Sequence, residues 1–208
     1  MMTIRKFTSR NFTIHDLIER KALTEVQAET LIEHVRRGDN LLISGGTGSG
    51  KTTMTNVLSS FIPDGDRILI LEDVAELYIR KPHVISAEAQ LDTHKSQIGF
   101  PDLLKAALRH RPDRIIVGEI RGTEARVFLD ALNTGHRGSL TTIHANSAED
   151  ALRRLAQLAM RGLGDGIPLH DVEEECRRSI DVIVQVMNQD GWRHVAEIRT
   201  LQHKLLVN

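Results

Sequence analysis

The chain has 208 residues, of which 40% are hydrophobic and 26% are charged, as is ordinary for a water-soluble globular domain. Its formal net charge of −1 gives no overall attraction to nucleic acid or to an anionic membrane surface, and only 3% of its residues are aromatic. We therefore expect an aliphatic core, no aromatic platform for stacking single-stranded bases and no sequence-specific nucleic-acid binding.

A single cysteine, Cys176, excludes an intrachain disulfide and a four-cysteine zinc module. Residues 1–10 lack the apolar segment of a secretory signal, and no apolar run approaches the roughly 18 residues of a membrane-spanning helix. We expect a cytoplasmic protein that associates with a membrane only through partners.

The first half of the chain alternates predicted helices and apolar strands. Thr24 and Gln27 predict a capping box at the start of the second helix. In chain order we predict a strand at 3–7, helices at about 13–20 and 24–37, a strand at 40–46, a helix at 50–62, and strands at 67–73 and 83–89.

The second half continues this alternation and ends in a hairpin. We predict a helix at 99–112, a strand at 113–120, a helix at 122–135, a strand at 139–145, and helices at 147–162 and 169–180. Two alternating runs within 180–201 flank Asp190 and Gly191, which is a strong hairpin signal. Trp192, the only tryptophan, is expected to pack in this hairpin rather than to stack on a ligand.

Strands that are almost wholly apolar and alternate with helices predict an α/β fold, with a mostly parallel sheet covered on both faces. Such sheets bind ligands at the carboxyl ends of their strands. The residues expected at those ends are Gly45, Glu72, Glu119 and His144.

Residues 45–52, GGTGSGKT, match the phosphate-binding pattern G-x-x-x-x-G-K-[ST] between a predicted strand and a predicted helix. Glycines let the backbone aim amide groups at phosphate oxygens, and the helix start adds partial positive charge. Lys51 is predicted to reach the β- and γ-phosphates, and Thr52 to bind Mg²⁺. The predicted nucleotide-binding residues are Gly45, Gly46, Thr47, Gly48, Ser49, Gly50, Lys51, Thr52 and Thr53.

Two other strands end in acidic residues. Glu119 is predicted to hold Mg²⁺, through a water molecule, and Glu72 or Asp73 to polarise the attacking water as general base. The alternative is that these acids cap the helices that follow them, because carboxylates favour helix N-termini. For Glu76, helix capping is the preferred interpretation.

Four segments in order resemble one known family. They are ISGGTGSGKTT (43–53), ILILEDVAEL (68–77), LRHRPDRIIVGEIRGTEA (108–125) and NTGHRGSLTTIHANSAEDALRRL (133–155). They resemble the Walker A, Asp box, Walker B and His box of the secretion-system traffic ATPases. The wording of the third segment is most similar to the branch that serves type IV secretion, conjugative transfer and tight-adherence pili.

The resemblance implies a RecA-like P-loop NTPase domain over 38–208, preceded at 1–37 by a strand remnant and linker helices. It implies Glu72 as catalytic base, Glu119 as Walker B acid, His144 as sensor of the γ-phosphate and Arg121 as a structural or inter-subunit arginine. The implied cofactors are ATP and Mg²⁺. The implied partners are further copies in a homo-hexamer and inner-membrane components of a secretion, conjugation or pilus machine.

The chain departs from the family pattern in two places. Members usually carry a further N-terminal domain whose arginines close over the nucleotide. Arg5 and Arg10 are candidates for one such arginine, or else are solvated charges on an edge strand. An arginine expected near Gln90 is missing, and Lys95 is its candidate substitute. A trimmed motor domain and a naturally minimal ATPase both fit this pattern.

The predicted function is that of an ATP-hydrolysing motor subunit that drives macromolecule transport or pilus assembly. A nucleotide-gated assembly module with negligible turnover is the alternative. A small P-loop kinase is disfavoured, because the sequence offers neither an arginine-rich lid nor an evident acceptor site.

Overall fold

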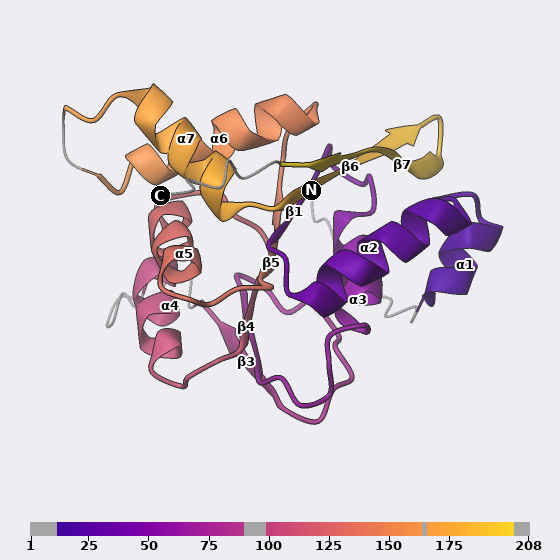
Figure 1. Cartoon of the computed structure of the whole chain (residues 1–208), viewed down its shortest axis with the longest axis horizontal. Coiled ribbons are helices and arrows are strands. Elements are labelled where there is room, and N and C mark those ends of the chain that lie inside the picture. The colour runs from indigo at the N-terminus through magenta and orange to yellow at the C-terminus, as the bar shows by residue number, and fades with distance from the viewer. Residues whose placement is uncertain (1–11, 90–98, 164–165, 202–208) are drawn as a thin grey trace, which may run out of the picture.

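A computed structural model describes residues 12–89, 99–163 and 166–201. Within these ranges seven strands form one sheet in the order β3-β2-β4-β5-β1-β6-β7 (Figure 1). Neighbouring strands are parallel except for β6 and β7, which pair antiparallel. The predicted mostly parallel sheet with a C-terminal hairpin is confirmed, whereas the strand predicted at 3–7 lies outside the described residues.

Helices and strands alternate along the chain much as predicted. The helices are α1 (Ile14–Glu19), α2 (Glu25–Arg37), α3 (Lys51–Ser59), α4 (Phe100–Leu108), α5 (Glu124–Asn133), α6 (Ala148–Met160) and α7 (Leu169–Ser179). The strands are β1 (Leu41–Gly45), β2 (Ile68–Glu72), β3 (Val84–Glu88), β4 (Arg114–Val117), β5 (Leu140–Ile143), β6 (Val182–Gln189) and β7 (Trp192–Thr200). None of the helices in the described ranges has the length and apolar character that crossing a membrane requires.

Local sequence signals account for several of these boundaries. Thr24 and Gln27 form the predicted capping box of α2, and the Ser147 hydroxyl caps α6 by accepting from the backbone N–H of Asp150. Asp190 and Gly191 both have positive φ, at 51° and 89°, as a tight hairpin turn requires. The boundary predicted for α4 was wrong, since it ends at Leu108 rather than at residue 112.

The early end of α4 has a local cause. Arg111 has a φ of 50°, outside the helical region, and it precedes Pro112. A proline disfavours helical geometry in the residue before it, so the chain leaves the helix and turns into β4.

The two faces of the sheet are covered by different helices. Helices α1, α2 and α3 lie over one face, and α4, α5, α6 and α7 lie over the other (Figure 1). Successive residues of β1 serve both sides, because side chains alternate along a strand. Leu41 and Ile43 pack in the cluster under α2 and α3, and Leu42 packs in the cluster under α5 and α6.

Strand order brings together four segments that are far apart in sequence. β5 lies between β1 and β4, and β2 lies on the other side of β4. The carboxyl ends of β1, β5, β4 and β2 are therefore neighbours along one edge of the sheet. The side chains that follow these strands meet there.

The opposite end of β4 is fixed by a buried arginine. The Arg114 side chain is 8% exposed, and its Nε donates to Asp66 Oδ2 over 2.7 Å. Gly138, with a φ of 72°, leaves the space that this guanidinium fills. A Cβ at residue 138 would lie 1.4 Å from Arg114 Nη1.

We predict that Gly138→Ala lowers the free energy of unfolding by about 2–4 kcal/mol, because it combines left-handed backbone strain with displacement of a buried charged side chain. Urea denaturation measures this change. Gly65→Ala is the matched control, since a Cβ there meets nothing within 4 Å. It should change the free energy of unfolding by no more than about 0.5 kcal/mol. Equal losses in the two variants would contradict the steric account.

Candidate functional site

The loop between β1 and α3 is built for close approach of an anion. Gly48 and Gly50 have φ values of 71° and 103°, and a Cβ on Gly45 would lie 2.3 Å from the Val186 carbonyl oxygen. Gly50 caps α3 without a side-chain acceptor for the first-turn N–H groups. These amides and the positive end of the helix dipole therefore favour a bound anion.

Lys51 points back into this loop. Its side chain is largely buried, and Nζ lies 2.9 Å from both the Gly45 and the Gly46 carbonyl oxygens. Nζ also lies 3.3 Å from Nδ1 of His144. Nζ lies 3.5 Å from Nε2 of the same ring as well, so the ammonium group faces two carbonyl oxygens and the imidazole. Burial lowers the pKa of Lys51, while the charge of Glu119 opposes that shift.

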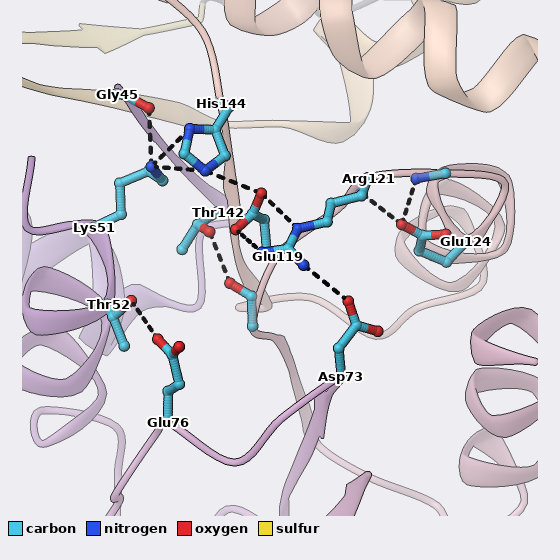
Figure 2. Close-up of polar contacts among 12 residues, drawn as sticks. Gly45, Lys51, Thr52, Asp73, Glu76, Glu119, Arg121, Glu124, Thr142 and His144 are labelled. Carbon is cyan, nitrogen blue, oxygen red and sulfur yellow. Dashed lines mark hydrogen bonds and ion pairs between the residues drawn. The ribbon is translucent and has the colours of Figure 1, made fainter. Parts of the chain in front are cut away.

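His144 follows directly after β5 and links the loop to the acidic strand ends (Figure 2). Its Nε2 lies 3.2 Å from Oε1 of Glu119. If Nδ1 accepts from Lys51, Nε2 carries the proton and donates to Glu119. The His144 side chain is 43% exposed.

Glu119 and Arg121 form a bidentate ion pair in the loop after β4. Arg121 Nε and Nη2 each lie 2.9 Å from a carboxylate oxygen of Glu119, and Nη1 donates to Asp73 over 3.3 Å. Burial alone would raise the pKa of Glu119. The hydrogen bond from Arg121 and the charges of His144, Arg121 and Lys51 bring that pKa below its usual value.

Glu72 is the last residue of β2, one strand further along the sheet edge. The carboxyl group is almost fully buried, and Oε1 accepts from the backbone N–H groups of Glu76 and Leu77 at 3.0 and 2.9 Å. Burial raises the pKa of Glu72, against the effect of these two hydrogen bonds. A Cβ on Gly118 would lie 2.9 Å from Glu72 Cγ, so the glycine permits this position.

The helix-capping role expected for Glu76 was wrong. Residues 73–83 form no helix, so there is no N-terminus after β2 for an acid to cap. Instead Glu76 Oε2 lies 3.5 Å from the Thr52 hydroxyl, which donates to it. The loop therefore folds back and carries this carboxylate to the start of α3.

One cleft of about 770 Å³ brings these side chains together. It is lined by residues 47–53 and by Glu72, Asp73, Glu76, Glu119, Arg121 and His144. Arg193 and Thr142, which sequence reasoning missed, also line it. Arg193 Nε donates to the Gly48 carbonyl over 2.8 Å, and the Thr142 hydroxyl donates to the Gly118 carbonyl over 2.7 Å. The contact of Arg193 joins residues 145 apart in sequence, so no local motif marks it.

The side chains that were expected to close over the nucleotide lie outside the described residues. Arg5, Arg10 and Lys95 lie outside the described residues, as does Gln90. Their predicted roles stay predictions.

The donor set around the loop suits a hard divalent cation. The Thr52 hydroxyl and the carboxylates of Glu76 and Glu119 are oxygen ligands of the kind Mg²⁺ prefers. Across the described ranges no group of three or more His, Cys, Asp and Glu side chains is placed to hold a metal by itself. Mg²⁺ in proteins usually keeps several waters and takes further ligands from substrate phosphates.

Comparison with known proteins identifies close relatives. A family model described as type II/IV secretion system protein matches residues 1–194. The conjugal transfer protein TrbB of Rhizobium radiobacter is 40% identical over 201 residues, covering 94% of this chain and 58% of the relative. The type IV secretion system protein VirB11 of Bartonella quintana is 33% identical over 232 residues, covering 95% of this chain and 65% of that protein.

A solved structure supports the same assignment of fold. The crystal structure of the VirB11 ATPase from the Brucella suis type IV secretion system, in complex with sulphate, superposes with a TM-score of 0.76. It is 31% identical in sequence, and the match covers 92% of this chain and 57% of that one. The predicted RecA-like fold is confirmed. The chain spans only about three fifths of the length of these relatives.

We predict that Glu72→Gln raises the free energy of unfolding above that of the parent at about pH 8. Because burial raises the pKa of Glu72, the folded state binds its proton at higher pH than the unfolded chain does. Above the folded-state pKa, the ionised carboxylate of Glu72 therefore lowers the free energy of unfolding. This loss disappears as the pH falls below the pKa of Glu in the unfolded chain, about 4.3. The gain in the free energy of unfolding from Glu72→Gln should therefore become smaller as the pH is lowered from about 8 to about 4.3.

Denaturant unfolding across this pH range measures the difference, with Glu29→Gln on the exposed face of α2 as the control. The control should stay within about 0.5 kcal/mol of the parent at each pH. A Glu72→Gln variant that is less stable than the parent at pH 8 would refute the claim that burial dominates.

Proposed function

The chain belongs to the type II/IV secretion system protein family, and from that premise we propose that its cleft binds and hydrolyses ATP. We further propose that hydrolysis drives macromolecule transport or pilus assembly by a secretion, conjugation or pilus machine. The observation that most directly supports this proposal is a continuous set of contacts. It runs from Lys51 through His144 and Glu119 to Arg121 and Asp73. It joins a phosphate-binding loop to the acidic ends of neighbouring strands, which is what phosphoryl transfer to water requires.

In the proposed reaction, backbone amides of residues 45–53 and Nζ of Lys51 hold the phosphates of ATP. Thr52 and Glu119 would hold Mg²⁺, the acid through a water, and Glu76 is a further candidate because it lies beside Thr52. When bound, the ion would offset negative charge on the phosphate oxygens. The ionised state of Glu119, which its cationic neighbours favour, suits this role.

Glu72 is the proposed general base. A carboxylate whose pKa is raised by burial is a stronger base than an exposed one, and two backbone amides fix its orientation at the cleft wall. Asp73 is the weaker candidate, because the Arg121 guanidinium already engages its carboxylate. In this scheme Glu72 takes a proton from the water that attacks the γ-phosphate.

His144 is the proposed sensor. It touches Lys51 on one side and Glu119 on the other, so a phosphate that draws Lys51 away from the imidazole would change the contact to Glu119 as well. Arg121 and Asp73 extend the same set of contacts toward the solvent-exposed rim. Arg121 is thus proposed as a structural or inter-subunit arginine rather than as a group that reacts.

The assembly and its partners are proposals of the same kind. We propose a homo-hexamer that works in the cytoplasm against inner-membrane components of the machine. The division into linker helices at 1–37 and an ATPase domain at 38–208 likewise stays a proposal.

A nucleotide-gated assembly module, which binds ATP without efficient turnover, is the second candidate. Nucleotide binding without phosphate release, in a chain that stays monomeric with a non-hydrolysable ATP analogue, would favour the module. Turnover together with a nucleotide-dependent hexamer would favour the motor.

We predict that Lys51→Ala lowers ATP turnover by about 100-fold or more, since a buried donor to a developing phosphate charge typically contributes that much. Phosphate release at saturating ATP measures it. Lys105→Ala, on the exposed face of α4, removes the same charge away from the cleft and should keep parental turnover. If Lys51→Ala hydrolysed ATP at the parental rate, the assignment of the site would be wrong.

We predict that His144→Ala keeps the affinity for ATP within about threefold but lowers turnover by about 100-fold, as expected for a group that acts during the proton and phosphoryl transfer. Binding is measured with a non-hydrolysable analogue, and turnover by phosphate release. His136→Ala serves as control, because that ring contacts the Ala131 carbonyl outside the cleft. Weaker binding with unchanged turnover per bound ATP would reduce His144 to a positioning role.

A further inference from the structure

Glu124 is a buried acid to which the proposed reaction gives no role. It is 8% exposed and is the first residue of α5, directly after the loop that carries Glu119 and Arg121. It is not among the residues that line the large cleft. Its Oε1 accepts from the backbone N–H groups of Arg121 and Gly122, at 2.5 and 2.6 Å (Figure 2). Such bonds are what make a carboxylate tolerable in a buried place.

These two hydrogen bonds point away from the helix that Glu124 begins. A capping side chain accepts from N–H groups in the first turn of its helix, and the acid of a capping box accepts from the N-cap residue itself. Glu124 instead bonds two residues that precede the N-cap, Thr123, which makes no side-chain cap bond of its own. The carboxylate therefore holds the loop before α5 rather than the helix.

The loop is held at its other end by the sheet. The Gly118 N–H donates to a carbonyl of β2 over 2.8 Å, and the Ile120 N–H donates to a carbonyl of β5 over 2.9 Å. Gly122 leaves room for the Glu124 carboxylate, because a Cβ at residue 122 would lie only 3.0 Å from Oε2. The short segment between β4 and α5 is thus fixed by the sheet where it begins and by Glu124 where it ends.

Arg121 connects this segment to the end of a second strand. Its guanidinium pairs with Glu119 through two contacts of 2.9 Å, and its Nη1 reaches Asp73 at 3.3 Å. The Arg121 side chain is 60% exposed, so packing does little to hold it, and an exposed ion pair is weak unless its geometry is well set. The main-chain position that Glu124 fixes therefore largely determines whether the guanidinium reaches both carboxylates.

We propose that Glu124 is a positioning residue for the proposed hydrolysis: it fixes the main chain at Arg121 and so aligns the guanidinium with Glu119 and Asp73. The inference rests on the proposed function, because the alignment of Glu119 matters only if the cleft acts on a nucleotide. This role requires an oxygen acceptor at the right distance. A purely structural role, in which the acid interacts favourably with the dipole of α5, requires a negative charge near the helix start instead.

Two conservative variants separate these roles. Glu124→Gln keeps an oxygen at the same distance and removes the charge, whereas Glu124→Asp keeps the charge and is one methylene shorter. We expect Glu124→Asp to lower kcat by about tenfold, since small misplacements in an active site have effects of this order or larger, and to keep the affinity for a non-hydrolysable ATP analogue within about threefold. Glu124→Gln should keep kcat within about threefold of the parent, because an amide oxygen still accepts both bonds, although more weakly.

Phosphate release at saturating ATP measures kcat, titration calorimetry measures the affinity, and urea denaturation checks that each variant is folded. Glu29→Asp is the matched control. It makes the same change on the exposed face of α2, away from the cleft, and should keep the parental kcat.

A double-variant cycle tests whether Glu124 acts through Arg121. Arg121→Ala should lower kcat at least as much as Glu124→Asp does. In a chain that already carries Arg121→Ala, Glu124→Asp should lower kcat by no more than about twofold further, because the effects of residues that act through one another do not add. An independent structural effect of Glu124 would multiply the two losses.

Each contrary outcome has a distinct meaning. If Glu124→Gln lost turnover while Glu124→Asp kept it, the charge would be what matters and the positioning role would be overturned. Parental kcat in Glu124→Asp, or losses that multiply in the double variant, would also overturn it and would leave the proposed hydrolysis standing. If the parent released no phosphate from ATP, the proposed function would fail, and this inference would fail with it.

Discussion

The candidate site depends on one side chain, His144, that contacts both Lys51 and Glu119. This contact is possible because β5 is inserted between β1, which leads into the phosphate-binding loop, and β4, which leads to Glu119. A strand order that separated β5 from β1 or from β4 would leave the imidazole beside only one of these groups. The parallel sheet thus converts three distant segments of sequence into one row of contacts (Figure 2).

Neighbouring groups offset the charges in this row. Lys51 is buried against carbonyl oxygens, and its pKa is lowered by that burial, whereas Glu119 is kept ionised by Arg121 and the other cations around it. Glu72, one strand further on, meets no such cationic partner among the described residues, and burial raises its pKa. The same sheet edge therefore holds two carboxylates with different proton affinities, a difference suited to binding a cation with one and accepting a proton with the other.

The sequence alone predicted the fold and most of the residues in this row of contacts, because the motifs that mark them are local. The glycine spacing of residues 45–52, the capping pairs and the turn at Asp190 and Gly191 each lie within a few residues of one another. Glu76 was misassigned because capping presumes a following helix, and the chain instead forms an extended loop after β2. Arg193 was missed as a residue of the cleft because its place depends on long-range packing of the hairpin against the loop at residues 45–52.

The central claim is that a nucleoside triphosphate engages Lys51, His144 and Glu119 as one unit. The most direct measurement is a crystal structure of the chain with Mg²⁺ and a non-hydrolysable ATP analogue. The account predicts the terminal phosphates within hydrogen-bond distance of Lys51 Nζ, the ion bound near Thr52 and Glu119, and the His144 ring facing the γ-phosphate. A triphosphate bound away from the loop, or one bound there with His144 and Glu119 turned away from it, would contradict the account.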